Sequence, residues 1–187
     1  MPRGAARPDL IRAAALRLFA ERGVAATSLQ HIATELGVTK AAVYHHYRAK
    51  ADIVLAVLEP ALACLAEIIT AAGGIADRAE RTRWVIESIA DQAVQHRGLY
   101  AVMLADATAT QLVATNRSPD FDTLSRLLTT ADPGQRVRVA MFLSALTAPA
   151  TDPDLASIND ADLRAGIASA GERLLFDSPA SPLNQAN

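Results

Sequence analysis

The stretch from Leu36 to Ile53 reads LGVTKAAVYHHYRAKADI and joins a glycine-containing turn to a short run of polar and aromatic side chains. It contains Lys40 and Lys50, the only two lysines of the chain, with two of the three tyrosines and two of the four histidines. The rest of the chain is rich in alanine and arginine. This concentration of rare polar groups indicates a binding surface.

Two short helices are expected on either side of the turn at Leu36–Val38. Thr27 or Ser28 can cap the first helix, and Thr39 can cap the second. Gly37 can adopt the positive φ that a tight turn requires. Apolar residues at helical spacing can pack the pair on a preceding helix: Leu29, Ile32, Leu36, Val38 and Val43. This pattern predicts a helix-turn-helix, whose second helix fits the DNA major groove.

Helical spacing continues on both sides of this motif. Pro8 can begin a helix that Gly23 ends, and a longer helix should begin near Lys50. Pro60 lies inside the longer helix and predicts a kink or a break near Leu58–Pro60. Further helices are expected at 79–95, 99–113, 121–128, 136–147 and 160–176. The sequence therefore predicts an all-α protein with about nine helices.

Composition is consistent with a folded protein whose charge is unevenly distributed. The 187 residues are 51% hydrophobic but only 4% aromatic, so small aliphatic side chains must fill the core. Residues 1–50 carry eight basic and three acidic side chains, a net charge of +5. Residues 51–187 carry ten arginines and seventeen acidic side chains, a net charge of −7. A basic amino-terminal module suits a polyanionic partner, although a solvated helix face would give the same count.

The single cysteine, Cys64, excludes an intramolecular disulfide and a cysteine-based zinc site. A small buried apolar role is the simplest interpretation of this residue. No apolar run that could serve as a signal sequence follows the first arginines, and no uncharged stretch approaches the roughly 18 residues needed to span a bilayer. We expect a cytoplasmic protein with no membrane association, no cofactor and no metal site.

The ordered motifs FAERG at 19–23, TSLxxIA at 27–33, LGV at 36–38 and VYxHYxxKxxI at 43–53 resemble the DNA-binding region of the TetR family of bacterial transcriptional regulators. The resemblance covers roughly residues 8–55. It implies groove-facing roles for Gln30, Thr39, Lys40, Ala41 and His45. It also implies contacts to the DNA backbone from Ser28, Tyr44, Tyr47 and Lys50.

Some of these residues have other interpretations. His46 faces away from His45 and can pack or cap inside the module, and the ring of Tyr47 can belong to the core. Ala49 stands where the family often has a small polar capping residue, so the following helix could start more loosely. Arg3 and Arg7 could reach a minor groove or remain in an unbound arm.

The resemblance further implies a helix-turn-helix domain at 1–49 and a ligand-binding and dimerisation domain at 50–176. The segment at 177–187 is polar and contains proline, so it is expected to be a flexible tail. Candidate ligand-binding residues are Leu65, Trp84, Ser88, Tyr100, Met103, Leu104, Phe121, Met141 and Phe142. Candidate dimer-interface residues are Leu143, Leu146, Leu163, Ile167, Gly171 and Leu174, which could instead be intramolecular core.

The predicted function is a ligand-responsive repressor that binds a palindromic operator as a homodimer and is released by a largely apolar small molecule. An activator or an architectural DNA-binding protein is the alternative. The sequence contains no Ser/His/Asp constellation, no HExxH motif and no phosphate-binding glycine loop, so we do not expect an enzyme.

Overall fold

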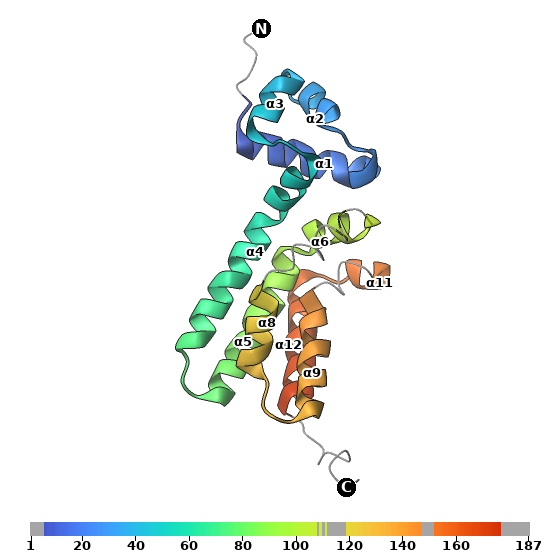
Figure 1. Cartoon of the computed structure of the whole chain (residues 1–187). Helices are drawn as coiled ribbons and strands as arrows, with labels where there is room; N and C mark the ends of the chain where they lie inside the picture. The colour runs from blue at the N-terminus through green and yellow to red at the C-terminus, as the bar shows by residue number, and fades with distance from the viewer. Residues whose placement is uncertain (1–5, 108, 110, 112–118, 147–151, 177–187) are drawn as a thin grey trace. The chain divides into compact units, whose positions relative to one another are not determined.

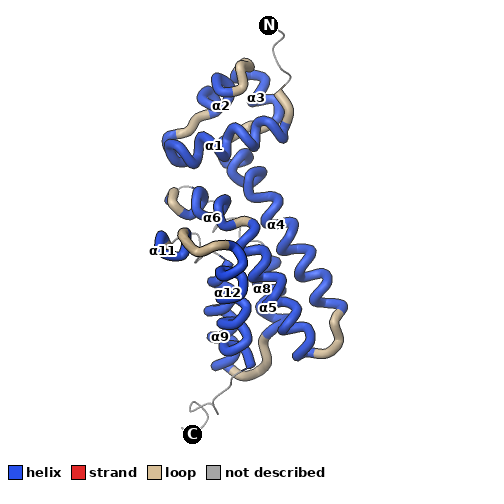
Figure 2. The backbone as a smooth tube through the Cα atoms, turned by 180° about the vertical axis from the view of Figure 1, so that it is seen from behind, coloured by secondary structure: helices blue, strands red, loops and turns tan. Residues whose placement is uncertain are grey.

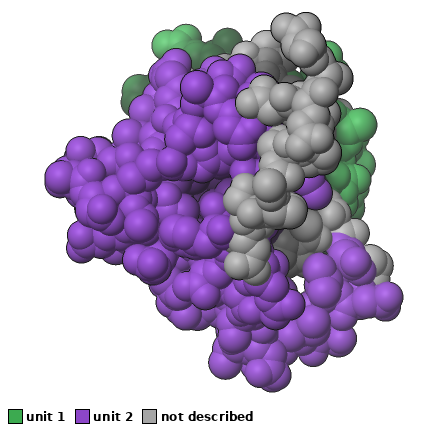
Figure 3. Space-filling view, turned by 90° about the horizontal axis from the view of Figure 1, so that it is seen from below, with its two compact units in different colours: residues 1–62, 98–117 green, residues 63–97, 118–187 purple. Residues whose placement is uncertain are grey.

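The computed structural model describes residues 6–107, 109, 111, 119–146 and 152–176, and all regular secondary structure in those ranges is helical (Figures 1 and 2). This confirms the all-α prediction. The chain forms two compact units, coloured separately in Figure 3. Unit 1 comprises residues 1–62 and 98–117, and unit 2 comprises residues 63–97 and 118–187. The boundary expected between residues 49 and 50 separates a DNA-binding domain from a ligand-binding domain. These compact units do not test it, and it stays a prediction.

Unit 1 contains α1 (Pro8–Ala26), α2 (Leu29–Glu35), α3 (Lys40–His46), the first half of α4 (Lys50–Gly74) and most of α6 (Arg97–Leu104). α2 packs against both α1 and α3, as Figure 1 shows. One apolar cluster lies between these helices, and its largest members include Ile11, Leu18, Phe19, Ile32, Ile53 and Met103.

The turn between α2 and α3 has the predicted geometry. Gly37 has φ 64°, in the left-handed region where residues with a Cβ are strained. The Val38 amide then donates to the Ala33 carbonyl at 2.9 Å, which folds the chain back over the end of α2. Ala33 is fully buried, so its small side chain allows the two helices to approach closely.

Unit 2 is a helical bundle formed by the second half of α4, α5 (Arg78–Gln95), α8 (Pro119–Leu128), α9 (Pro133–Leu143) and α12 (Asp160–Phe176). α12 packs on both α5 and α9, and α8 contacts α5 and α9. Two shorter elements, η1 (Ser144–Leu146) and α11 (Pro153–Ala156), connect α9 to α12. The core is almost entirely aliphatic, as the composition predicted, with Phe142 as its buried aromatic ring among the described side chains.

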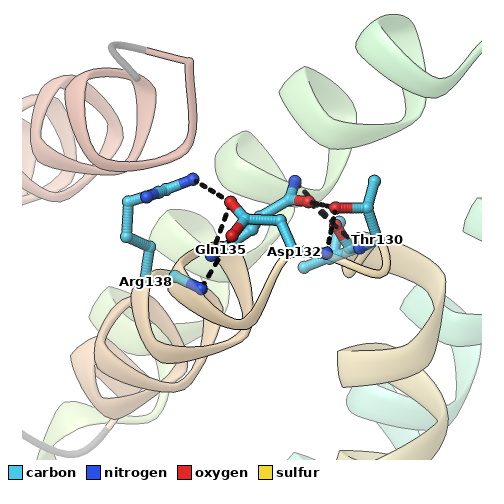
Figure 4. Close-up of polar contacts among 6 residues, drawn as sticks. Thr130, Asp132, Gln135 and Arg138 are labelled. Carbon is cyan, nitrogen blue, oxygen red and sulfur yellow. Dashed lines mark hydrogen bonds and ion pairs between the residues drawn. The ribbon is translucent and has the colours of Figure 1, made fainter. Parts of the chain in front are cut away.

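A polar cluster fixes the turn between α8 and α9 (Figure 4). The Asp132 carboxylate caps α9 by accepting from the Gly134 amide at 2.9 Å and the Gln135 amide at 3.1 Å. The Gly134 bond is the main reason that the pKa of Asp132 lies below its ordinary value. The buried Gln135 amide accepts from the Thr130 backbone and hydroxyl and donates to the Leu128 carbonyl. The turn thus satisfies its own polar groups inside the bundle.

Three helices depart from the sequence expectations. α4 is one uninterrupted helix with Pro60 inside it, so the break considered at that point is absent. α6 ends at Leu104, short of the expected 113, because the Asp106 carboxylate accepts from the Ala109 amide at 3.2 Å and starts a new turn. α11 was not expected; Asp152 caps it through the Asp154 amide.

Among the described residues, α4 is the helix that is long and apolar enough to cross a bilayer, and 39% of its most apolar window is buried within the protein. Glu59 and Glu67 interrupt its apolar run, which is why the sequence predicted no spanning segment. Core helices of soluble proteins have the same length and composition, so this property alone does not place α4 in a membrane.

A close contact in unit 2 makes one glycine necessary. A Cβ added at Gly171 would lie 2.5 Å from Cε2 of Phe142 and 3.0 Å from Cγ2 of Ile86. We therefore expect Gly171→Ala to lower the free energy of unfolding by about 1–3 kcal/mol through overpacking. Urea unfolding at one protein concentration measures this change.

Gly166 offers the matched control in the same helix. A Cβ added there meets nothing within 4 Å. Gly166→Ala should therefore raise the free energy of unfolding by about 0.5–1 kcal/mol, since alanine is the better helix former. Equal effects of the two substitutions would contradict the close packing of α12 against α5 and α9.

Candidate nucleic-acid interface

The outward face of α3 carries an exposed row of side chains at Lys40, Ala41, Tyr44 and His45, while Val43 points into the core of unit 1. The spacing of one and four residues places the row on one side of the helix. Together with Arg48, these residues line an open surface hollow of about 520 Å³. Four of the five residues that line this hollow were predicted DNA contacts, and Arg48 was not.

Two predicted DNA contacts are also helix caps. The Ser28 hydroxyl accepts from the His31 amide at 3.2 Å, and the His31 ring accepts from the Ser28 amide at 3.3 Å, which completes a capping box on α2. The Thr39 hydroxyl accepts from the Ala42 amide at 3.2 Å and caps α3. A hydroxyl that accepts a bond still has a proton to donate, so capping is compatible with a contact to phosphate.

The side chain of Lys50 makes two contacts within unit 1 that the sequence did not predict. Its ammonium donates to the Val24 carbonyl at 2.7 Å and to the Ala25 carbonyl at 3.0 Å, at the end of α1. It thereby adds a charged donor to two carbonyls in the last turn of α1, where the Val24 carbonyl also accepts from the Thr27 amide at 3.2 Å. An ammonium has three N–H bonds, so one remains available for a phosphate.

The start of α4 is secured although Ala49 has no capping side chain. The Asp52 carboxylate accepts from the Ala49 amide at 2.8 Å and supplies the returning half of a capping box. The looser joint that Ala49 suggested is therefore compensated from within the first turn.

The remaining predicted contacts lie around this surface. Gln30 is exposed on α2, with its amide 3.4 Å from the Thr34 hydroxyl. Tyr47 is half-buried against the core of unit 1, and burial raises the pKa of its phenol. His46 is exposed, and its Nε2 lies 2.6 Å from the Ala6 carbonyl, which ties the chain before α1 to the end of α3.

Most of the arginines of unit 1 are paired with carboxylates. The described pairs are Arg7–Asp9 at 2.7 Å, Arg12–Glu59 and Arg17–Glu35 at 2.8 Å each, and Arg22–Glu21 at 3.9 Å. In the part of unit 1 that the structure describes, Lys40 and Arg48 are the cations that have neither a carboxylate nor a carbonyl partner. Among the described residues, the positive charges without such a partner therefore lie on α3 and just after it.

The candidate ligand-binding residues do not form one cluster. Met103 is buried in unit 1, where Tyr100 and Leu104 are half-buried. Leu65 and Phe142 are buried in the core of unit 2. The other candidates in unit 2 are more open: Trp84 and Met141 are exposed, and Ser88 is half-buried and donates to the Trp84 carbonyl. The side chain of Phe121 lies outside the described residues.

Most of the candidate dimer residues lie inside unit 2 itself. Leu143, Leu163, Ile167 and Gly171 are buried in its core, and Leu174 is half-buried. This placement corresponds to the intramolecular alternative that the sequence left open. The side chain of Leu146 and the tail at 177–187 lie outside the described residues.

The two lysines should differ in their effect on folding. Lys50→Ala is expected to lower the free energy of unfolding by about 1–2 kcal/mol, because two carbonyls at the end of α1 lose a charged donor. Lys40→Ala, at an exposed site, should change it by less than about 0.5 kcal/mol. Chemical denaturation of both variants measures the difference, and equal stabilities would show that the Lys50 bonds contribute nothing to folding.

Comparison with known proteins gives matches to the same region. The family model described as bacterial regulatory proteins, tetR family, matches residues 11–57. An uncharacterized HTH-type transcriptional regulator of Bacillus subtilis (strain 168), YerO, is 46% identical over 44 residues, which are 24% of this chain and 15% of that protein. The HTH-type transcriptional regulator AcrR of Shigella flexneri is 51% identical over 39 residues, which are 21% of this chain and 18% of that protein. These matches span less than a fifth of either relative.

Similarity of fold extends over most of the chain. A crystal structure of the transcriptional regulator FadR from Bacillus subtilis in complex with stearoyl-CoA superposes with a TM-score of 0.70 at 17% identity. The match covers 92% of this chain and 100% of that one. At this identity the likeness is one of fold alone, and it includes helices beyond the helix-turn-helix. The sequence match to the tetR family model is thus confined to the helix-turn-helix region at residues 11–57, and beyond that region the likeness is one of fold alone.

Proposed function

We propose that the protein is a transcriptional regulator that binds DNA through α2 and α3. The observation that carries the proposal is the exposed row on α3, where Lys40 stands without a carboxylate partner beside Tyr44 and His45. An α-helix fits the major groove, and a lysine near its amino end can donate to guanine O6 and N7. The match of residues 11–57 to the tetR family model supports the same role for this helix.

The remaining contacts complete an interface with both base and backbone recognition. Base contacts are proposed for Gln30, Thr39, Lys40, Ala41 and His45. Backbone contacts are proposed for Ser28, Tyr44, Tyr47 and Lys50, through hydroxyl protons and the ammonium.

We further propose that the protein is a homodimer that binds a palindromic operator. α9 exposes Val137, Ala140 and Met141 along one face, which Ser144 of η1 continues, and the exposed fractions of Val137 and Met141 reach 59% and 60%. α12, which packs against α9, adds small residues such as Ala165 and Ser169. These outward residues are better interface candidates than the buried ones, which fix how α9 and α12 pack. Two copies joined there would present two α3 helices to two half-sites.

A charge placed on this face tests the dimer. Met141→Glu should give a monomer in sedimentation at concentrations where the unmodified protein is a dimer, because the association would bury an unpaired charge. Ala71→Glu, at an exposed site on α4, is the matched control and should leave the dimer intact. A dimeric Met141→Glu variant would exclude this face.

The effector is proposed to be a largely apolar small molecule that releases the protein from DNA. The regulator FadR of similar fold was crystallised with stearoyl-CoA, which makes a long-chain acyl-CoA the first probe. α4 contributes residues to both units, so a change in unit 2 can reach the helix-turn-helix through a continuous helix. The test is to add stearoyl-CoA or stearate to the protein bound to DNA and to measure release of the DNA. If the DNA stays bound with both compounds, neither is the effector.

An activator that uses the same DNA surface is the alternative. Footprinting of the bound sites relative to promoters separates the two, since a repressor should overlap the polymerase site and an activator should bind upstream of it.

DNA binding itself has a direct test. The protein should bind DNA from the region upstream of its own reading frame about 10³-fold or more tightly than random DNA of equal length at moderate salt. Lys40→Ala should reduce this preference, since one base contact is worth about 1–3 kcal/mol of discrimination. Binding to both DNAs with equal affinity by the unmodified protein would exclude sequence-specific recognition of this site.

A further inference from the structure

We propose that Arg48 is a phosphate-binding residue of the DNA surface, held in position by the ring of Tyr44. The inference rests on the proposed function, since it assigns a further contact to the same surface. Arg48 follows α3 in the short connection to α4 and is exposed. It lines the hollow on α3 with Lys40 and His45, yet no family motif quoted from the sequence includes it.

The geometry of Arg48 leaves its donors available. Its guanidinium carbon lies 5.6 Å from the centroid of the Tyr44 ring, within cation–π range. A cation–π contact needs no hydrogen-bond acceptor, so it leaves the five N–H bonds of the guanidinium available. An arginine held in this way can still donate two parallel bonds to a phosphate.

The surroundings of Arg48 set it apart from the other described arginines of unit 1. Arg7, Arg12, Arg17 and Arg22 each have a carboxylate within ion-pair distance, and Arg48 has none. A paired arginine must exchange its carboxylate for a phosphate, which cancels much of the electrostatic gain. Arg48 would instead neutralise a phosphate outright and release a counterion.

The position of Arg48 favours a contact to the DNA backbone over a contact to the bases. Lys40 is the first residue of α3, the end from which recognition helices contact base edges. Arg48 lies beyond the carboxyl end of α3, a helix of seven residues that is about 10 Å long, and follows the extended residue Tyr47. The major groove is roughly 12 Å wide, so side chains at the two ends of this surface can reach a base edge and a groove wall together.

The Tyr44 side chain then has two separable functions. Its hydroxyl can donate to a phosphate, as the family resemblance implies, and its ring orients Arg48. Phenylalanine keeps the ring without the hydroxyl, whereas leucine removes both. The two substitutions therefore separate orientation of Arg48 from direct contact.

The salt dependence of DNA binding tests the proposal. Arg48→Ala should weaken binding roughly tenfold on both the upstream DNA and random DNA. It should also reduce the slope of log affinity against log salt by about 0.9 for each bound protomer. Arg48→Gln, which keeps a polar side chain without the charge, should show the same loss of slope and guards against a folding defect in the alanine variant.

Arg22→Ala is the matched control, since it removes an exposed arginine of unit 1 that Glu21 accompanies. The slope of log affinity against log salt should be the same for this variant as for the unmodified protein. An unchanged slope in both Arg48 variants would overturn the proposal while leaving DNA binding intact. Failure of the unmodified protein to bind any DNA would instead overturn the proposed function and this inference with it.

The role of Tyr44 is tested by repeating the Arg48→Ala measurement in two backgrounds. In Tyr44→Phe, removal of Arg48 should reduce affinity as much as in the unmodified protein. In Tyr44→Leu, the reduction should be smaller, because the unstacked guanidinium is less well placed before it binds. Equal reductions in the three backgrounds would show that the ring does not position Arg48.

Discussion

The backbone N–H and carbonyl of Ala25 join three segments of unit 1 that are distant in sequence. Its N–H donates to the Asp106 carboxylate at 2.7 Å, and its carbonyl accepts from the Lys50 ammonium at 3.0 Å. Segments distant in sequence therefore meet at the end of α1, where Gly23 has φ 81° and breaks the helical geometry. These bonds give partners to backbone groups in the last turn of α1, just before the capped start of α2.

This junction explains why the first compact unit is larger than the motif seen in the sequence. The helix-turn-helix needs α1 and the start of α4 to complete its core, and Met103 of α6 belongs to the same cluster. α6 is remote in sequence from α1, and only the folded chain shows that most of it belongs to the same unit. A conformational change of α6 would therefore move Met103, which packs in the same apolar cluster as α1, α2 and α3.

Local chemistry made the amino-terminal third predictable. The positive φ of Gly37, the capping roles of Ser28 and Thr39 and the burial of Ile32 and Val43 follow from residue types at fixed spacing. The ends of α5 and α12 were also close to the predicted ones, since Asp77 caps the first and Asp160 begins the second.

Features that depend on tertiary contacts were not predictable in the same way. Apolar periodicity marks a buried face of a helix but does not say whether the same chain or a second copy covers it, so Leu163 and Ile167 had two interpretations. The net charge of residues 1–50 likewise could not show that four of its arginines have carboxylate partners. Arg48 was missed because its significance lies in its stacking on Tyr44 and in the lack of a nearby carboxylate.

The capping box on α2 has an electrostatic consequence. Glutamate or glutamine usually occupies the third helical position of such a box, and here the His31 ring accepts the returning bond. A glutamate would cap the helix equally well but would put a negative charge beside Ser28, where a phosphate is proposed to bind. A neutral imidazole completes the cap without that charge, so the start of α2 is stabilised without repelling the DNA backbone.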